Sequence, residues 1–203
     1  MTKIKICGLK RLQDIEYVNE FLPDFIGFVF AGTKRKITDE KAKELKAALN
    51  PKIKAVGVFV NDTLEHISFL ANNNIIDIIQ LHGDENKEYI ENLRKITNKK
   101  IIKAVRVKDS KSVTDAEVLN ADYLLLDTFS NSGEYGGTGK TFNRELIPKD
   151  ISDYFLAGGL NQDNLEEIIK EVKPYAVDLS SGVETDGFKE REKIKKVIEI
   201  VRQ

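Results

Sequence analysis

Residues 175–184, with the sequence YAVDLSSGVE, decide the fold that we expect for this chain. Their first half is a short apolar run typical of a buried strand, and the run stops at Ser180, Ser181 and Gly182. Small residues at a strand end let backbone N–H groups face a ligand without a side chain in the way. A short helix beginning near Gly182 would add its positive dipole end, which suits a phosphate group.

The same design occurs one strand–helix unit upstream, in residues 154–159 with the sequence YFLAGG. There the apolar strand at 155–157 ends at Gly158 and Gly159. In a barrel of parallel strands, the last two strand ends form a phosphate site of this kind. We therefore predict that the two stretches together hold the phosphate of a small molecule and that chemistry occurs beside it.

Strand-like runs recur along the whole chain at a steady spacing. They are expected to begin near residues 3, 25, 53, 76, 101, 122, 154 and 175. The mean step of roughly 25 residues is the length of one strand plus one crossover helix. We predict one α/β domain over residues 1–203, a compact single-domain (β/α)₈ TIM barrel with its phosphate site after strands 7 and 8. An open doubly wound sheet is the alternative, but eight strand–helix units are more than such a sheet usually contains.

Helices are expected between the strands because apolar residues recur there at i, i+3 and i+4. The stripes lie near residues 12–22, 42–49, 64–71, 90–96, 165–172 and 194–201, with a weaker one at 113–119 and a short helix at 143–147. Thr38 and Asn161 are the expected N-caps of two of these helices. The long stretch at 128–140 is predicted to be a mobile lid over the active site.

Composition excludes several kinds of partner and compartment. Lys+Arg number 32 and Asp+Glu 33, so the net charge of −1 favours neither nucleic acid nor an anionic membrane. The chain begins with a lysine at every second residue and has no apolar run long enough to cross a bilayer, so we expect neither secretion nor membrane insertion. One cysteine fits a reducing compartment, and a cytoplasmic protein is expected. The sequence leaves a monomer and a homodimer equally open.

Five polar side chains are expected at the carboxyl ends of the strands or in the loops that follow: Cys7, Arg35, His82, Asp127 and Asp178. In a barrel of this type, active sites are built at that end. Cys7 and Asp127 end the first and sixth strands, so they can face each other across the mouth. A thiolate and a protonated carboxyl are a workable general base and general acid if their pKa values are brought into range.

Each candidate also has a plainer interpretation. A lone cysteine such as Cys7 often serves as a small core residue. Asp127 or Asp178 could cap a loop, although acids rarely end apolar strands for packing alone. His82 could equally be a structural histidine, and Arg35 could belong to a solvated basic loop. The other histidine, His66, is predicted to lie on a helix surface without a partner.

Two familiar motifs are absent from the sequence. Residues 133–141, GEYGGTGKT, resemble a phosphate-binding P-loop, but that pattern needs glycine at position 134, where this chain has Glu134. No His/Cys cluster has metal-ligand spacing, and no G-x-G-x-x-G follows a strand. We therefore expect neither a metal nor an organic cofactor.

Taken together, eight short motifs resemble the phosphoribosylanthranilate isomerase family, in the same order from the first strand to the last. They are KICG (5–8), GFVF (27–30), VGVFV (56–60), QLHG (80–83), LDT (126–128), GGTGKTF (136–142), AGGL (157–160) and DLSSGVE (178–184). The resemblance implies a (β/α)₈ barrel that works in tryptophan biosynthesis without metal or cofactor. It also implies that the substrate is a small phosphosugar, N-(5-phosphoribosyl)anthranilate, converted by an Amadori rearrangement.

Carried over by motif, the resemblance gives Cys7 the role of general base for the C2′ proton. Asp127 becomes the general acid that protonates the ribose ring oxygen, and Arg35 the partner of the anthranilate carboxylate. The remaining substrate-binding assignments are His82, Asp178 beside the sugar, and the phosphate grip of Gly158, Gly159, Ser180, Ser181 and Gly182.

Some features keep other interpretations open. The loop that ends at Arg35 reads AGTKR and lacks the proline and serine often found there in the family. A different phosphosugar isomerase or lyase could share the phosphate site without the anthranilate pocket. A regulatory module that binds a phosphometabolite would show affinity without turnover and would not need Cys7 and Asp127 together.

Overall fold

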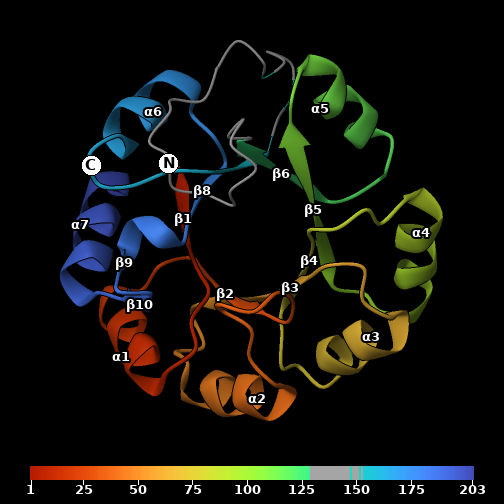
Figure 1. Ribbon diagram of the computed structural model, residues 1–203, viewed down its shortest axis with the longest axis horizontal. Coiled ribbons are helices and arrows are strands. Elements are labelled where there is room, and N and C mark those ends of the chain that lie inside the picture. Colours follow the sequence, from red (N-terminus) through yellow and green to blue (C-terminus); the bar gives the residue numbers. More distant parts are fainter. Residues whose placement is uncertain (129–146, 148–150, 152) are drawn as a thin grey trace.

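Eight parallel strands close into a barrel in the computed structural model, which describes residues 1–128, 147, 151 and 153–203 (Figure 1). Each strand pairs with the next along the chain, and the eighth pairs with the first. The strands are β1 (Lys3–Cys7), β2 (Phe25–Val29), β3 (Lys54–Phe59), β4 (Ile78–Leu81), β5 (Lys100–Val107), β6 (Tyr123–Thr128), β7 (Phe155–Ala157) and β8 (Ala176–Leu179). The predicted (β/α)₈ barrel is confirmed, and the open sheet is wrong.

Helices cover the outside of this barrel (Figure 1). Those in the described residues are α1 (Leu12–Phe21), α2 (Asp39–Ala48), α3 (Leu64–Asn72), α4 (Lys87–Ile96), α5 (Ser110–Glu117), α6 (Leu165–Val172) and α7 (Arg191–Val201). None of them has both the length and the apolar character needed to cross a membrane. The predicted helix at 143–147, apart from its last residue, and the predicted lid at 128–140, apart from its first, lie outside the described residues.

The helix starts show which local sequence signals are reliable. Thr38 accepts a hydrogen bond from the backbone N–H of Lys41, so its prediction as an N-cap is confirmed. The prediction of Asn161 is wrong, because α6 begins at Leu165 and Asn164 occupies the N-cap position. Asn161 instead accepts a hydrogen bond from the N–H of Asp163 within the turn before the helix. Both residues are asparagines in one turn, so composition alone could not choose between them.

Two separate hydrophobic cores hold the barrel. The larger one lies between the strands and the surrounding helices, and the smaller one fills the barrel interior. The interior core contains the first residues of several strands, including Phe25, Ile78, Phe155 and Ala176. Burying a phenylalanine or isoleucine side chain contributes about 1.5–3 kcal/mol. Because this core closes the amino-terminal end, polar side chains can gather inside the barrel towards the carboxyl ends of the strands.

The last strand is followed by a short insertion before its helix. It consists of a 3₁₀ turn η2 (Ser181–Val183) and a small antiparallel hairpin, β9 (Glu184–Thr185) with β10 (Phe188–Lys189). The expectation of a short helix near Gly182 is confirmed by η2. Asp186 and Gly187 both have positive φ, 51° and 75°, which matches the Asp-Gly preference of a two-residue hairpin turn. The hairpin folds the chain back towards β1.

Candidate active site

Four neighbouring strands carry an inward row of residues near the carboxyl end of the barrel. Asp127 of β6 pairs in register with Ala157 of β7, Ala157 pairs with Asp178 of β8, and Asp178 pairs with Lys5 of β1. Cys7 follows Lys5 by two residues, so the two side chains point to the same face of β1. Cys7, Asp178 and Asp127 therefore belong to one end of the barrel.

Cys7 is held in a tight, charged environment. The residue is 9% exposed, and its sulfur fits against β2 because Gly27 has no side chain there. A Cβ at Gly27 would lie 2.6 Å from the Cys7 Sγ. Burial raises the pKa of the Cys7 thiol, while the positive charges of Lys5 and Lys189 act in the opposite direction. Burial prevails, so the pKa of the thiol lies above its ordinary value, and the two lysines lessen that shift.

Arg35 reaches this site from the loop after β2. Its side chain crosses directly over Gly8, whose φ is +86° and where a Cβ would lie 2.4 Å from the Arg35 Cδ. Arg35 donates from Nε and Nη2 to the two carboxylate oxygens of Glu184, at 2.8 and 2.7 Å. The position of Arg35 at this end of the barrel depends on the space at Gly8, and the carboxylate that Arg35 contacts in this structure is Glu184.

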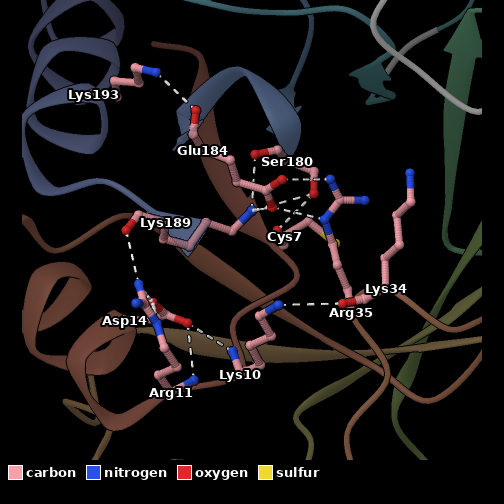
Figure 2. Close-up of polar contacts among 10 residues, drawn as sticks. All are labelled: Cys7, Lys10, Arg11, Asp14, Lys34, Arg35, Ser180, Glu184, Lys189 and Lys193. Atoms are coloured by element: carbon pink, nitrogen blue, oxygen red, sulfur yellow. Dashed lines mark hydrogen bonds and ion pairs between the residues drawn. The ribbon is translucent and has the colours of Figure 1, made fainter. Parts of the chain in front are cut away.

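Glu184 is shared between two cations, as Figure 2 shows, with Arg35 and Lys189 approaching it from opposite sides. Lys189 Nζ lies 2.6 Å from the Glu184 carboxylate and also donates to the backbone carbonyl of Ser180, at 2.9 Å. Burial opposes ionisation of Glu184, but the hydrogen bonds and charges of Arg35 and Lys189 hold its pKa at about 2. Glu184 is therefore an anion at every ordinary pH.

Ser180 connects this network to the first strand. Its hydroxyl donates a hydrogen bond of 3.0 Å to the backbone carbonyl of Cys7 (Figure 2). The loop after β8 is thereby fastened to the carboxyl end of β1. Ser180, predicted as part of a phosphate grip, uses its hydroxyl proton for this contact, while Ser181 beside it is exposed.

His82 and Asp127 form a second polar group at the same end of the barrel. His82 Nε2 lies 3.3 Å from Asp127 Oδ2, and the two side chains are 24% and 32% exposed. The amide nitrogen of Gln80 lies 3.0 Å from His82 Nδ1. With that amide donating, Nδ1 accepts, so Nε2 carries the ring proton and faces the carboxylate. Both side chains are more exposed than Cys7 and can contact a small molecule.

The loops after β7 and β8 lie against each other. Gly158 and Gly159 have φ values of 97° and 63°, which glycine adopts without strain. At Gly182 a Cβ would lie only 2.0 Å from the backbone carbonyl oxygen of Leu160. The glycines predicted to hold a phosphate thus lie in two adjoining loops, and at Gly182 the contact between the loops leaves no space for a side chain.

Sequence reasoning missed four members of the site: Lys5, Gln80, Glu184 and Lys189. Lys5 is fully buried and contacts Asp178 at 2.8 Å, Lys189 is buried under Glu184, and Gln80 orients His82. The signal for Lys5 was its position two residues before Cys7 on one strand, and that spacing alone does not show whether the two side chains face the barrel interior. Lys189 gave none, because the hairpin that turns it inward has no periodic pattern.

The prediction for the other histidine is right about its helix, since His66 lies on α3, but wrong about its partners. His66 has two partners, Asp62 at 2.7 Å from Nδ1 and Asp39 at 3.0 Å from Nε2. Its ring also meets those of Phe30 and Phe59 edge-on. Asp62 is four residues away on the sequence, but Asp39 belongs to another helix and could be found only by folding the chain. His66 therefore joins α2 to α3 and is not part of the site.

Among the described residues, no group of three or more His, Cys, Asp and Glu side chains is arranged to hold a metal ion. The polar groups at the barrel mouth are instead a thiol, carboxylates, an imidazole and ammonium or guanidinium cations. Such a set can move protons and bind anions.

Comparison with known proteins points to one family. The family model for N-(5'-phosphoribosyl)anthranilate (PRA) isomerase matches residues 4–200. The chain is 48% identical over 202 residues to the N-(5'-phosphoribosyl)anthranilate isomerase of Endomicrobium trichonymphae, covering all of this chain and 99% of the relative.

Solved structures agree. The crystal structure of phosphoribosyl anthranilate isomerase from Thermotoga maritima superposes with a TM-score of 0.87 at 36% identity, over 100% of this chain and 99% of the other. Two further structures each superpose with a TM-score of 0.82 at 33% identity, with the same coverage. One is an isomerase in complex with reduced 1-(o-carboxyphenylamino)-1-deoxyribulose 5-phosphate, and the other shows monomers generated from the dimeric Thermotoga maritima isomerase.

Proposed function

Since this chain belongs to the N-(5'-phosphoribosyl)anthranilate isomerase family and is an isomerase of tryptophan biosynthesis, we propose that it works by acid and base catalysis from its own side chains. The substrate would be N-(5'-phosphoribosyl)anthranilate, and the product 1-(2-carboxyphenylamino)-1-deoxyribulose 5-phosphate. The observation that carries the proposal is the row Asp127–Ala157–Asp178–Lys5, which brings a carboxylic acid and the Cys7 thiol to one mouth.

The first step is opening of the ribose ring, and its acid is Asp127. A proton passes from the Asp127 carboxyl to the ring oxygen, the bond between that oxygen and C1′ breaks, and the nitrogen lone pair forms a Schiff base. The contact between His82 and Asp127, at 3.3 Å, supports this role because it fixes the carboxyl while leaving it accessible. General acid catalysis of this kind contributes about 10²- to 10⁴-fold to a rate.

The second step is removal of the C2′ proton, and its base is the Cys7 thiolate. The electrons of the C–H bond move towards the Schiff base and give an enolamine, while the sulfur becomes a thiol. The enolamine then takes a proton at C1′ while its C2′ hydroxyl loses one, which leaves a ketone at C2′, so the overall change is an isomerisation. The cations around Cys7 support this assignment, since they counteract the cost of ionising a buried thiol.

Arg35 is proposed to bind the carboxylate of the anthranilate ring. Glu184 takes the Nε–Nη2 edge of the guanidinium, and a guanidinium has a second, Nη1–Nη2 edge that also fits two carboxylate oxygens. In this arrangement Glu184 orients Arg35 and the substrate binds to its outer edge. Asp178, in contact with Lys5, is proposed to lie beside the sugar.

The phosphate is proposed to bind at the loops containing Gly158, Gly159, Ser180, Ser181 and Gly182. Their glycine backbone and mutual contact support close approach of an anion to N–H groups. Every residue assigned here comes from one chain. The proposed chemistry therefore uses side chains of a single chain, whether the protein is a monomer or a homodimer.

The test is a fluorescence assay for loss of N-(5'-phosphoribosyl)anthranilate on adding the purified protein, with and without a chelator. We expect conversion at the same rate in both, and none with Asp127→Asn. Conversion that stops with the chelator would contradict the side-chain mechanism, and an active Asp127→Asn would assign the acid to another group.

A further inference from the structure

Lys5 is a lysine whose side chain is completely buried inside the barrel. An ammonium group in such a place is unstable unless it meets an opposite charge. Asp178, its register partner across β1 and β8, supplies that charge through Oδ2 at 2.8 Å. Burial works against the charged form of Lys5, but Asp178 and Cys7 outweigh it and raise the lysine pKa. Lys5 therefore stays protonated.

The position of Lys5 couples it to Cys7. The two are successive inward residues of β1, and the Cys7 sulfur is confined from the other side by the space that Gly27 leaves. Asp178 accepts Lys5 on one oxygen only, and its Oδ1 is buried with no hydrogen-bond partner among the described residues. Lys5 thus lies between a fixed carboxylate and the thiol.

Other charged groups near Cys7 are arranged differently. Glu184 forms ion pairs with both Lys189 of β10 and Arg35 of the loop after β2. Its negative charge therefore partly neutralises these two cations. Asp178, from β8, disfavours the thiolate, and Lys5 is the largest influence in the opposite direction. Lys5 differs from these two cations because it lies on the same strand as Cys7 and pairs with Asp178 instead of Glu184.

We propose that Lys5 is a positioning residue for Cys7, holding the thiolate in place at the end of β1 and stabilising its negative charge. The inference rests on the proposed role of Cys7 as the base. When Cys7 takes the C2′ proton and becomes neutral, Asp178 still neutralises Lys5, so the lysine needs no change of protonation during the reaction.

The test measures the thiolate directly by its ultraviolet absorbance across a pH series. Because the chain has one cysteine, subtracting the signal of Cys7→Ser isolates Cys7 from the six tyrosines. In Lys5→Met we expect the thiolate titration to move upward by about one pH unit or more. Lys103→Met is the matched control, since Lys103 is equally buried but contacts Glu85, at 2.9 Å, on the other side of the barrel. The control should leave the titration unchanged.

Lys5→Met leaves Asp178 buried without a partner and could prevent folding. The comparison is then made between Asp178→Asn and Asp178→Asn/Lys5→Met, where the upward shift should persist. The proposal is overturned if the thiolate titration is the same with and without Lys5, whether position 178 is Asp or Asn. Failure of the base assignment itself looks different, because Cys7→Ala would then turn over substrate while the titration shift remained.

Discussion

His82 Nε2 lies 3.3 Å from Asp127 Oδ2 across the barrel mouth, with the neighbouring strand β5 between their two strands. Gln80 holds the other ring nitrogen of His82, at 3.0 Å. This relationship gives an otherwise ambiguous histidine a defined task. It fixes the carboxyl that we propose as the acid, and it does so with a side chain that a substrate can also reach.

Replacing His82 by glutamine should lower kcat by about 10- to 100-fold, because a hydrogen bond to a charged group is worth about 1.5–3 kcal/mol. KM should change little, since the proposed contact acts on Asp127 rather than on bound substrate. Steady-state kinetics on the fluorescent substrate measure both. His66→Gln is the control and should keep its kcat. Equal kcat for His82→Gln and the unaltered protein would reduce His82 to a structural residue.

Gly27→Ala should lower kcat by roughly 100-fold by displacing the Cys7 sulfur, which the new Cβ would meet at 2.6 Å. Gly57→Ala is similarly crowded, with Ile76 and Phe59 atoms 2.8 Å from its Cβ, but it lies away from the thiol. Both should cost about 1–3 kcal/mol of stability. Urea unfolding compares the stabilities, and kinetics compare kcat. If the two variants lost activity equally, the displacement of Cys7 would not be the cause.

Arg35→Lys should mainly raise KM, by a factor corresponding to about 1–3 kcal/mol, because lysine keeps the charge but loses the planar fork. Arg191→Lys provides the comparison, since Arg191 also contacts a glutamate, Glu20, but lies on the outer helices. Its KM should be unchanged. An unaltered KM in Arg35→Lys would contradict the proposed contact between Arg35 and the substrate carboxylate, and would leave Glu184 as its partner.

His66 should make stability depend on pH. Burial lowers its pKa, but Asp39 and Asp62 outweigh this and raise the pKa above the unfolded value of 6.5. The histidine therefore binds a proton more tightly in the folded state. Its contribution, less than about 1 kcal/mol for such a partly exposed group, is complete below pH 6.5 and lost as the pH rises through the folded pKa.

Urea midpoints of the unaltered protein and His66→Gln check this sign. Their difference should be largest in mild acid and shrink towards alkaline pH. A difference that stays constant, or grows with pH, would mean that His66 is not protonated between the two aspartates.

Much of the fold was predictable because its signals are local. Each strand is a short apolar run, each helix is a stripe at helical spacing, and small residues follow the two strands whose loops we propose to bind phosphate. Thr38 caps its helix through a contact three residues away. Even α5, with a weak stripe, forms because Asp109 accepts a hydrogen bond from the N–H of Ser112.

The contacts that could not be predicted depend on which face of a strand lies in the barrel interior, or on residues far apart in the sequence. The alternation of Lys3, Lys5 and Cys7 is the same whether those side chains face solvent or the barrel interior, and only closure against β8 puts Lys5 next to Asp178. The pairing of Arg35 with Glu184 joins residues 149 positions apart. Local patterns carry no information about such a contact.

The central claim is that the Cys7 thiolate removes the C2′ proton. It is tested most directly by a single turnover with Cys7→Ala in excess over N-(5'-phosphoribosyl)anthranilate, following the fluorescence of the bound substrate. We predict that the variant binds the substrate but that its fluorescence decays no faster than in buffer alone. A decay within tenfold of the unaltered protein would contradict the account, because less than about 1.4 kcal/mol of the barrier would then depend on the thiol.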